Sequence, residues 1–153
     1  MSLRSTRHTT FAIERIYKFA ASKVFGAWST AEGKASWFVG PHDQWKLVKR
    51  EFDFRVGGRE FVSGQFANGP ISTFDSRYHD IIANERIVYA YDMDLDGKKI
   101  SVSLATVEFK AVKEGTRLIF TEQAAFLDDY MDNGSRERGT IGLLDQLGVA
   151  LNR

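Results

Sequence analysis

The sequence predicts an α+β protein in which a curved antiparallel sheet of seven strands wraps around one long C-terminal helix, with two short helices after the first strand. Three observations support this fold. The hydrophobic period lengthens from two residues to a helical spacing after Tyr17, strand-like sequence with regular turn signals occupies residues 45–126, and helical spacing returns over residues 135–153. We expect residues 1–153 to form a single domain, with residues 1–8 as a flexible N-terminus.

The first strand is expected over residues 11–17, where apolar and polar residues alternate except that Arg15 falls in the apolar phase. The next stretch, SKVFGAWSTAEGKASWF, places its large apolar residues at helical spacing on one face. Ser22 and Thr30 are of the residue types that cap helix N-termini. The sequence therefore predicts two short helices here, capped by these two side chains.

Residues 45–126 are rich in Val, Ile, Phe, Tyr and Thr, the residue types that favour strands. Turn signals divide this region into six strands, and they lie at Gly57-Gly58, Asn68-Gly69-Pro70, Asn84-Glu85, Asp96-Gly97 and Glu114-Gly115. Strands joined by about two to four residues leave no room for the crossover that parallel pairing needs. The six strands are therefore expected to form an antiparallel meander.

The segment FRVGGREF raises the question of a phosphate-binding loop. Such a loop requires the spacing G-x-G-x-x-G between a strand and a helix, so that backbone N–H groups face the anion. Here Gly57 and Gly58 are followed by strand-like sequence. We therefore predict a hairpin turn, with Phe54 facing the core and Arg55 pointing the opposite way.

The last segment is expected to form the long helix. At 100° per residue its apolar face carries Thr140, Ile141, Leu144, Leu147, Gly148 and Leu151. A helix with such a face must cover one face of the curved sheet, and that geometry can enclose a cavity. Gly148 on this face indicates either room for a ligand or close contact between helix and sheet.

Several motifs occur in the order FAIERIY, ASKVFGAWST, WF, FDFRVGGRE, RYHDIIANERIVYAY, GTRLIFTEQ and GTIGLLDQLGVAL. Together they resemble the successive motifs of Aha1-like domains in the SRPBCC (START-related) superfamily, over residues 11–151. The resemblance implies the helix-grip fold. It leaves the function open, because that superfamily includes hydrophobic-ligand carriers, aromatase/cyclases, a self-sacrificing antibiotic resistance protein and co-chaperone domains.

Two features indicate space beneath the helix. In the family that these motifs resemble, the position of Thr140 is usually a tryptophan. The smaller residue either enlarges the cavity, or the lost volume is filled by Trp37 or Tyr130. The sixth strand changes its apolar phase between Leu104 and Val107, which indicates a bulge or burial on both faces. If the odd-numbered residues face the helix, small side chains at 101, 103 and 105 point inward.

Glu122 is a carboxyl group on an otherwise apolar face of the last strand, which it shares with Phe120. A buried carboxylate must be paired or protonated, and Arg15 and Arg55 are the candidate partners. Glu122 is expected either to form a structural salt bridge, or to bind a polar group of a ligand or transfer a proton. His79 lies in strand-like sequence and is either an ordinary strand residue or a second titratable group in the cavity.

Composition excludes several functional classes. The chain has 21 basic and 20 acidic side chains without long runs of one sign, so we expect no nucleic-acid partner. The absence of cysteine and the scattered positions of His8, His42 and His79 predict no metal site and no cofactor. With no apolar run of about 20 residues, we expect no membrane insertion and a cytoplasmic protein.

We therefore interpret the chain as a domain that binds a hydrophobic small molecule, either a lipid or a polycyclic aromatic compound, in a cavity between sheet and helix. The residues expected to line this cavity are Trp28, Trp37, Phe38, Phe54, Tyr78, Tyr89, Tyr91, Phe120, Glu122, Thr140 and Leu144. The sequence is also compatible with a homodimer.

Two alternatives remain at this stage. The first is a cyclase- or hydrolase-type enzyme in which Glu122 or His79 acts as acid or base, with Tyr78 or Tyr89 as the electrophilic donor. It requires two titratable groups to meet in one cavity, and we prefer binding to catalysis. The second is a co-chaperone-like interaction module, for which an exposed apolar patch and a filled interior are expected.

Overall fold

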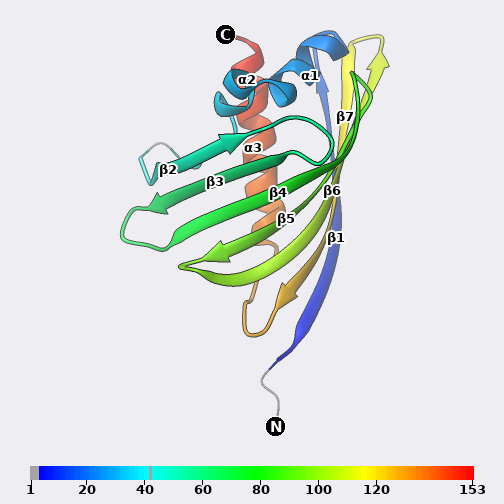
Figure 1. The fold of residues 1–153 in the computed structure, drawn as a ribbon. Helices are drawn as coiled ribbons and strands as arrows, with labels where there is room; N and C mark the ends of the chain where they lie inside the picture. Colours follow the sequence, from blue (N-terminus) through cyan, green and yellow to red (C-terminus); the bar gives the residue numbers. More distant parts are fainter. Residues whose placement is uncertain (1–3, 42) are drawn as a thin grey trace.

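The computed structural model describes residues 4–41 and 43–153. The elements in chain order are β1 (Thr6–Tyr17), α1 (Ala21–Ser29), α2 (Ala31–Ala35), β2 (Trp45–Phe52), β3 (Arg59–Phe66), β4 (Ile71–Ile82), β5 (Arg86–Leu95), β6 (Lys98–Val112), β7 (Gly115–Leu127) and α3 (Ser135–Leu151). The strands form one antiparallel sheet in the order β1-β7-β6-β5-β4-β3-β2 (Figure 1). The predicted α+β fold is confirmed.

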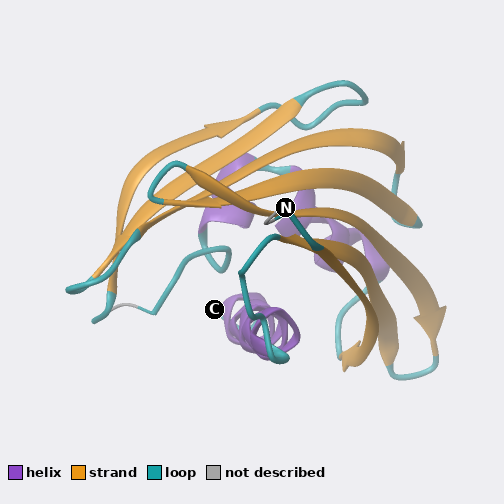
Figure 2. Ribbon diagram, turned by 90° about the horizontal axis from the view of Figure 1, so that it is seen from below, coloured by secondary structure: helices purple, strands orange, loops and turns teal. Residues whose placement is uncertain are grey.

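The sheet curves around α3, which lies inside the concave face (Figure 2). The helices α1 and α2 sit near the C-terminal end of α3 and close that end of the concavity (Figure 1). The inward face of α3 buries Thr140, Leu144, Leu147 and Leu151, four of the residues predicted for it. Gly148 lies 3.4 Å, measured from an ideal Cβ, from the ring of Tyr17, so this glycine marks close contact between helix and sheet.

The first strand is longer than predicted. It begins at Thr6, and residues 6–8 pair with residues 125–127 of β7. The range predicted for the flexible N-terminus, residues 1–8, is therefore too long, because residues 6–8 belong to β1. Residues 1–3 lie outside the described part of the chain. Alternation missed residues 6–8 because their side chains are mostly exposed at the sheet edge, where pairing of the backbone does not require an apolar pattern.

One of the two predicted helix caps is correct. The Thr30 hydroxyl accepts a hydrogen bond from the Gly33 backbone N–H at 3.0 Å and so caps α2. Ser22 does not cap α1, because it lies inside the first turn, after the N-cap residue Ala20. That prediction was wrong by two positions.

The Gly57-Gly58 segment is a hairpin turn between β2 and β3, as predicted. Gly57 has a φ of 84°, and a Cβ on Gly58 would overlap the backbone of Asp53, so both positions favour glycine. Arg55 points to solvent and pairs with Asp53 at 2.9 Å. It lies away from the face that Phe54 helps to cover, as its register predicts.

The β6 strand contains a bulge, but it lies near the start of the strand and not between Leu104 and Val107, where the change of apolar phase indicated one. The pairing of β5 with β6 shifts register after Met93, so that Ile100 is the extra residue. Beyond this bulge Ser101 and Ser103 are buried, whereas Val102 and Leu104 face solvent. Two small hydroxyl side chains are therefore presented to the concave face beneath α3.

Candidate functional site

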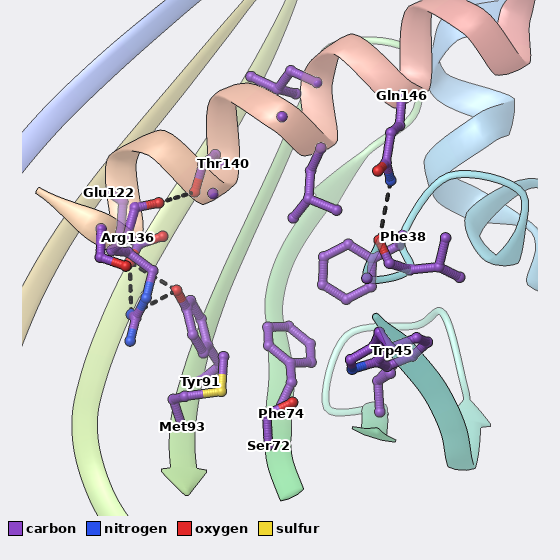
Figure 3. A pocket seen from close by; sticks show the side chains of 18 of the residues that line it. Phe38, Trp45, Ser72, Phe74, Tyr91, Met93, Glu122, Arg136, Thr140 and Gln146 are labelled. Carbon is purple, nitrogen blue, oxygen red and sulfur yellow. Dashed lines mark hydrogen bonds and ion pairs between the residues drawn. The ribbon is translucent and has the colours of Figure 1, made fainter. Parts of the chain in front are cut away.

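A pocket of about 490 Å³ lies between α3 and the concave face of the sheet (Figure 3). Its walls are largely aromatic and come from several elements; they include Trp28, Trp37, Phe38, Trp45, Phe74, Tyr89, Tyr91 and Phe120. The helix contributes small and aliphatic groups, among them Gly139, Thr140, Leu143 and Leu144. Strand alternation explains the sheet wall, because alternate residues of β4, β5 and β7 project to the same face.

Most side chains expected to line the cavity do line this pocket. They are Trp28, Trp37, Phe38, Tyr89, Tyr91, Phe120, Glu122, Thr140 and Leu144. Thr140 lines the pocket, and so do Trp37 and Tyr130, the two residues considered as compensation for a tryptophan at this position. The pocket also includes Trp45, Phe74 and Met93, which the sequence did not single out.

Phe54 and Tyr78 do not line the pocket, and their assignment is corrected. Phe54 packs against Tyr78, with ring centroids 4.8 Å apart, and against Phe25 of α1 at 5.8 Å. The Tyr78 hydroxyl donates a hydrogen bond to Glu60 at 2.6 Å. Both rings thus belong to the packed core under α1. Tyr78 does face the interior, but the expectation that it lines the cavity did not distinguish core from pocket.

His79 lies outside the cavity. It occupies a bulge in β4, between Tyr78 and Asp80 in the pairing with β5, and its side chain is exposed. Glu122 is 1% exposed on the concave face. The two groups do not share a pocket, so the expected pairing of Glu122 with His79 for acid/base catalysis is wrong.

Glu122 belongs to a polar cluster at one end of the pocket (Figure 3). The Tyr91 hydroxyl donates to its Oε2 at 2.7 Å, and Nη1 of Arg136 lies 3.2 Å from the same oxygen. The guanidinium also donates to the Tyr91 hydroxyl at 2.9 Å, to Ser103 at 3.2 Å and to Ser101 at 2.7 Å. The guanidinium therefore donates hydrogen bonds to three hydroxyl groups as well as to the Glu122 carboxylate.

The predicted partners of Glu122 were wrong. Arg15 pairs instead with Asp145 at 3.4 Å near the edge of the helix, and Arg55 lies in the distant hairpin. The true partner, Arg136, sits in the first turn of α3, four residues before Thr140. That i, i+4 spacing puts it on the inward face and is the signal in the sequence that identifies it.

Electrostatics favour the charged form of Arg136. Burial lowers the pKa of Arg136, but the neighbouring Tyr91 and Glu122 outweigh burial and raise it above its ordinary value. Burial raises the pKa of the Tyr91 hydroxyl, and the positive charge of Arg136 offsets this only in part. Tyr91 thus remains a neutral donor beside a guanidinium and a carboxyl group.

A second polar cluster lies behind the pocket wall. Lys34 and Glu60 are each 1% exposed, and Lys34 Nζ lies 2.7 Å from Oε1 of Glu60. The ammonium also lies 4.4 Å from the ring centroid of Phe38 and 5.2 Å from that of Trp28, two rings that line the pocket. Sequence reasoning missed this pair because Lys34 sits in the polar stretch AEGKAS, which carries no apolar periodicity.

Within residues 4–41 and 43–153, no group of three or more His, Asp or Glu side chains is placed to hold a metal ion. In the same part of the chain, no helix is long and apolar enough to cross a bilayer. His42, one of the three histidines considered for metal binding, lies outside the described residues.

Solved structures resemble this fold closely. An uncharacterized protein from Rhizobium leguminosarum is 43% identical, with a TM-score of 0.95 over 99% of each chain. A protein from Rhizobium loti is 38% identical, with a TM-score of 0.87 over 95% of this chain and 99% of that one. An AHSA1-like protein from Aeromonas hydrophila shares the fold at 21% identity and a TM-score of 0.68, over 94% and 92% of the chains.

The search of curated proteins returned no match. The family model for the Activator of Hsp90 ATPase homolog 1-like proteins matches residues 18–152. That span runs from the end of β1 to the end of α3 and includes both walls of the pocket. The chain therefore belongs to the Activator of Hsp90 ATPase homolog 1-like family, within the SRPBCC superfamily that its motifs resemble.

Proposed function

We propose that this protein binds a hydrophobic small molecule, lipid-like or aromatic, in the pocket between α3 and the sheet. The observation that carries the proposal is a pocket of about 490 Å³ with aromatic walls and a polar cluster at one end. Ligand pockets commonly measure about 300–1,000 Å³ and combine apolar walls with a few placed polar groups. This pocket has both features.

Burial of apolar surface supplies the driving force, at about 25 cal/mol per Å². The rings of Phe38 and Trp45 offer broad apolar surfaces away from the polar cluster (Figure 3). The Arg136–Glu122 pair lies at the opposite side, where a polar group on the ligand would set its orientation. The ligand is therefore expected to be amphipathic, with most of its surface apolar.

The alternatives receive less support. The enzyme hypothesis loses one of its two acid/base candidates, because His79 lies on the outer face. The family is named for activators of the Hsp90 ATPase, and an interaction module of that kind was expected to have a filled interior. An unfilled aromatic pocket favours ligand binding over that alternative.

A substitution that fills the pocket tests the proposal. Thr140→Trp places an indole into the space between helix and sheet, whereas Val149→Trp adds the same ring at an exposed position of α3. We expect the wild type and Val149→Trp to be stabilised by members of a panel of lipids and polycyclic compounds. A ligand at 100 times its Kd raises the free energy of unfolding by about 2.7 kcal/mol.

We expect Thr140→Trp to remain folded and to lose this stabilisation, because the indole occupies the ligand's volume. Thermal unfolding with and without each compound measures the effect, and native mass spectrometry of protein from its own host identifies what co-purifies. The proposal is rejected if no compound stabilises the wild type and nothing co-purifies, or if Thr140→Trp binds as tightly as Val149→Trp.

A further inference from the structure

The geometry points to the chemical group that this pocket recognises: an uncharged hydroxyl, alcoholic or phenolic, bound between Arg136 and Glu122. This inference rests on the proposed function and names the polar group of its ligand. Two features of the pocket support it: the hydrogen-bonding capacity that the polar cluster retains, and the charge balance of the lining residues.

Arg136 retains donors for a ligand. A guanidinium carries five N–H groups. The described residues accept from Nη1 and Nη2 of Arg136 and not from its Nε. The side chain is 11% exposed and borders the pocket, so this group is not sealed in the core. The cluster can thus donate a further hydrogen bond.

Glu122 retains an acceptor. Within the described part of the chain, both groups that bind its carboxylate, Tyr91 and Arg136, do so at Oε2. Oε1 is left with its lone pairs on a residue that lines the pocket. The same cluster therefore offers one donor and one acceptor. A hydroxyl group is both acceptor and donor and can satisfy the two together, whereas a carboxylate only accepts and an ammonium only donates.

The charge balance leads to the same conclusion. Among the described residues that line the pocket, the charged side chains are Glu122, Asp132 and Arg136, which sum to a formal charge of −1. The Asp132 carboxylate already accepts from the backbone N–H of Arg136 at 2.9 Å, at the N-terminus of α3. A ligand carboxylate would add a second uncompensated negative charge in a desolvated site, which is costly. A ligand cation would lie against the Arg136 guanidinium.

Four probes with one aromatic body test the inference: 2-naphthol, 2-naphthoate, 2-(aminomethyl)naphthalene and 2-methylnaphthalene, measured by calorimetry at about pH 7. For the wild type we expect 2-naphthol to bind about tenfold more tightly than each of the others, since a hydrogen bond to a charged group is typically strong enough for a tenfold change in Kd. The comparison keeps the apolar contacts constant and changes only the polar group.

Glu122→Gln gives the decisive result. It removes the negative charge but keeps the shape, so Arg136 becomes an unpaired cation and the preference should reverse in favour of 2-naphthoate. Asp145→Asn is the matched control, because Asp145 is also a carboxylate partnered by an arginine but is exposed and outside the pocket. We expect it to leave all four affinities unchanged. If Glu122→Gln does not fold, Arg136→Gln should abolish the advantage of 2-naphthol over 2-methylnaphthalene.

The outcomes separate the two proposals. Equal binding of all four probes, or a wild type that prefers 2-naphthoate or the amine, overturns the hydroxyl inference and leaves ligand binding intact. A folded Glu122→Gln variant with the wild-type order of affinities overturns it as well. Failure of the wild type to bind any of the four probes overturns the hydroxyl inference, whereas the proposed function is decided by the panel of lipids and polycyclic compounds and by what co-purifies.

Discussion

Lys34 and Glu60 form an ion pair at 2.7 Å in the interior, and each side chain is 1% exposed. The Tyr78 hydroxyl donates to the same Glu60 oxygen at 2.6 Å, and the ammonium lies among aromatic rings. Burial lowers the pKa of Lys34, while Glu60 opposes this shift. The pair ties α2 to β3 immediately behind the pocket wall.

Breaking this pair should destabilise the protein strongly. Lys34→Met preserves much of the side-chain volume but leaves Glu60 buried without its cation. The expected loss is about 3–5 kcal/mol in the free energy of unfolding, measured by urea denaturation. The double variant Lys34→Met/Glu60→Gln should lose less than the sum of the two single variants, because no unpaired charge remains.

The exposed pair of Arg59 and Asp75, with Nε and Oδ1 2.8 Å apart, is the control. Arg59→Met should cost clearly less than Lys34→Met, since Asp75 and Glu51 remain in contact with water when their cation is removed. Equal losses for Lys34→Met and Arg59→Met would show that burial does not set the strength of the inner pair.

Stability should fall steeply in alkaline solution. Burial raises the pKa values of Tyr17, Tyr78, Tyr89 and Tyr91 above their ordinary 10.0. Above about pH 10 the unfolded chain loses these protons and the folded protein retains them, so the free energy of unfolding decreases as pH rises. Each tyrosine contributes about 1.4 kcal/mol per pH unit in this range. The lowered pKa of Lys34 has the opposite effect on the free energy of unfolding, but it is one group against four tyrosines.

Tyr89→Phe isolates one of these contributions. Because it removes one buried hydroxyl, the dependence of stability on pH should become shallower by about 1.4 kcal/mol per pH unit above about pH 10. Urea denaturation at several pH values between about 9 and 11 measures it. A slope identical to that of the wild type would contradict the assignment of alkaline unfolding to buried tyrosines.

Gly64 should be required for the position of Trp45 at the pocket. A Cβ on Gly64 would overlap the indole ring of Trp45, which packs across the β2–β3 pair and borders the pocket. Gly64→Ala is therefore expected to displace the ring and to reduce stability by about 1–3 kcal/mol. Urea denaturation measures the loss, and tryptophan fluorescence reports the displacement.

Gly142→Ala provides the contrast. An added Cβ there meets no atom within 4 Å, and the position lies in the interior of α3. Alanine is a better helix former than glycine by up to about 1 kcal/mol, so this variant should be more stable than the wild type. A loss of stability in Gly142→Ala equal to that of Gly64→Ala would contradict the assignment of the Gly64→Ala loss to the contact with Trp45.

Much of the fold follows from local patterns along the chain. The change of hydrophobic period after Tyr17 and the paired glycines at 57 and 58 mark element boundaries, because strands and helices repeat at different spacings and turns need particular residues. The inward face of β5, with Tyr89 and Tyr91, also follows from alternation. Edge pairing at residues 6–8 does not, since it involves backbone groups with exposed side chains.

The pocket is predictable only in part. Alternation shows that Tyr78 and Tyr91 both point inward, but their surroundings depend on which side chains of other elements reach the same space. Tyr78 meets Phe54 and Glu60 in the core, whereas Tyr91 meets Arg136 at the pocket. Such differences arise from contacts between residues far apart in sequence, which no local period encodes.

The sequence by itself determined the order of the elements, the inner faces of β5, β7 and α3, and the presence of a carboxyl group at position 122 on an apolar face. Only the tertiary structure decided which cations pair with the buried carboxylates: Arg136 with Glu122, and Lys34 with Glu60. The physical reason is that local spacing sets the direction of a side chain, whereas the pairing of buried charges depends on distances that the packed chain alone creates.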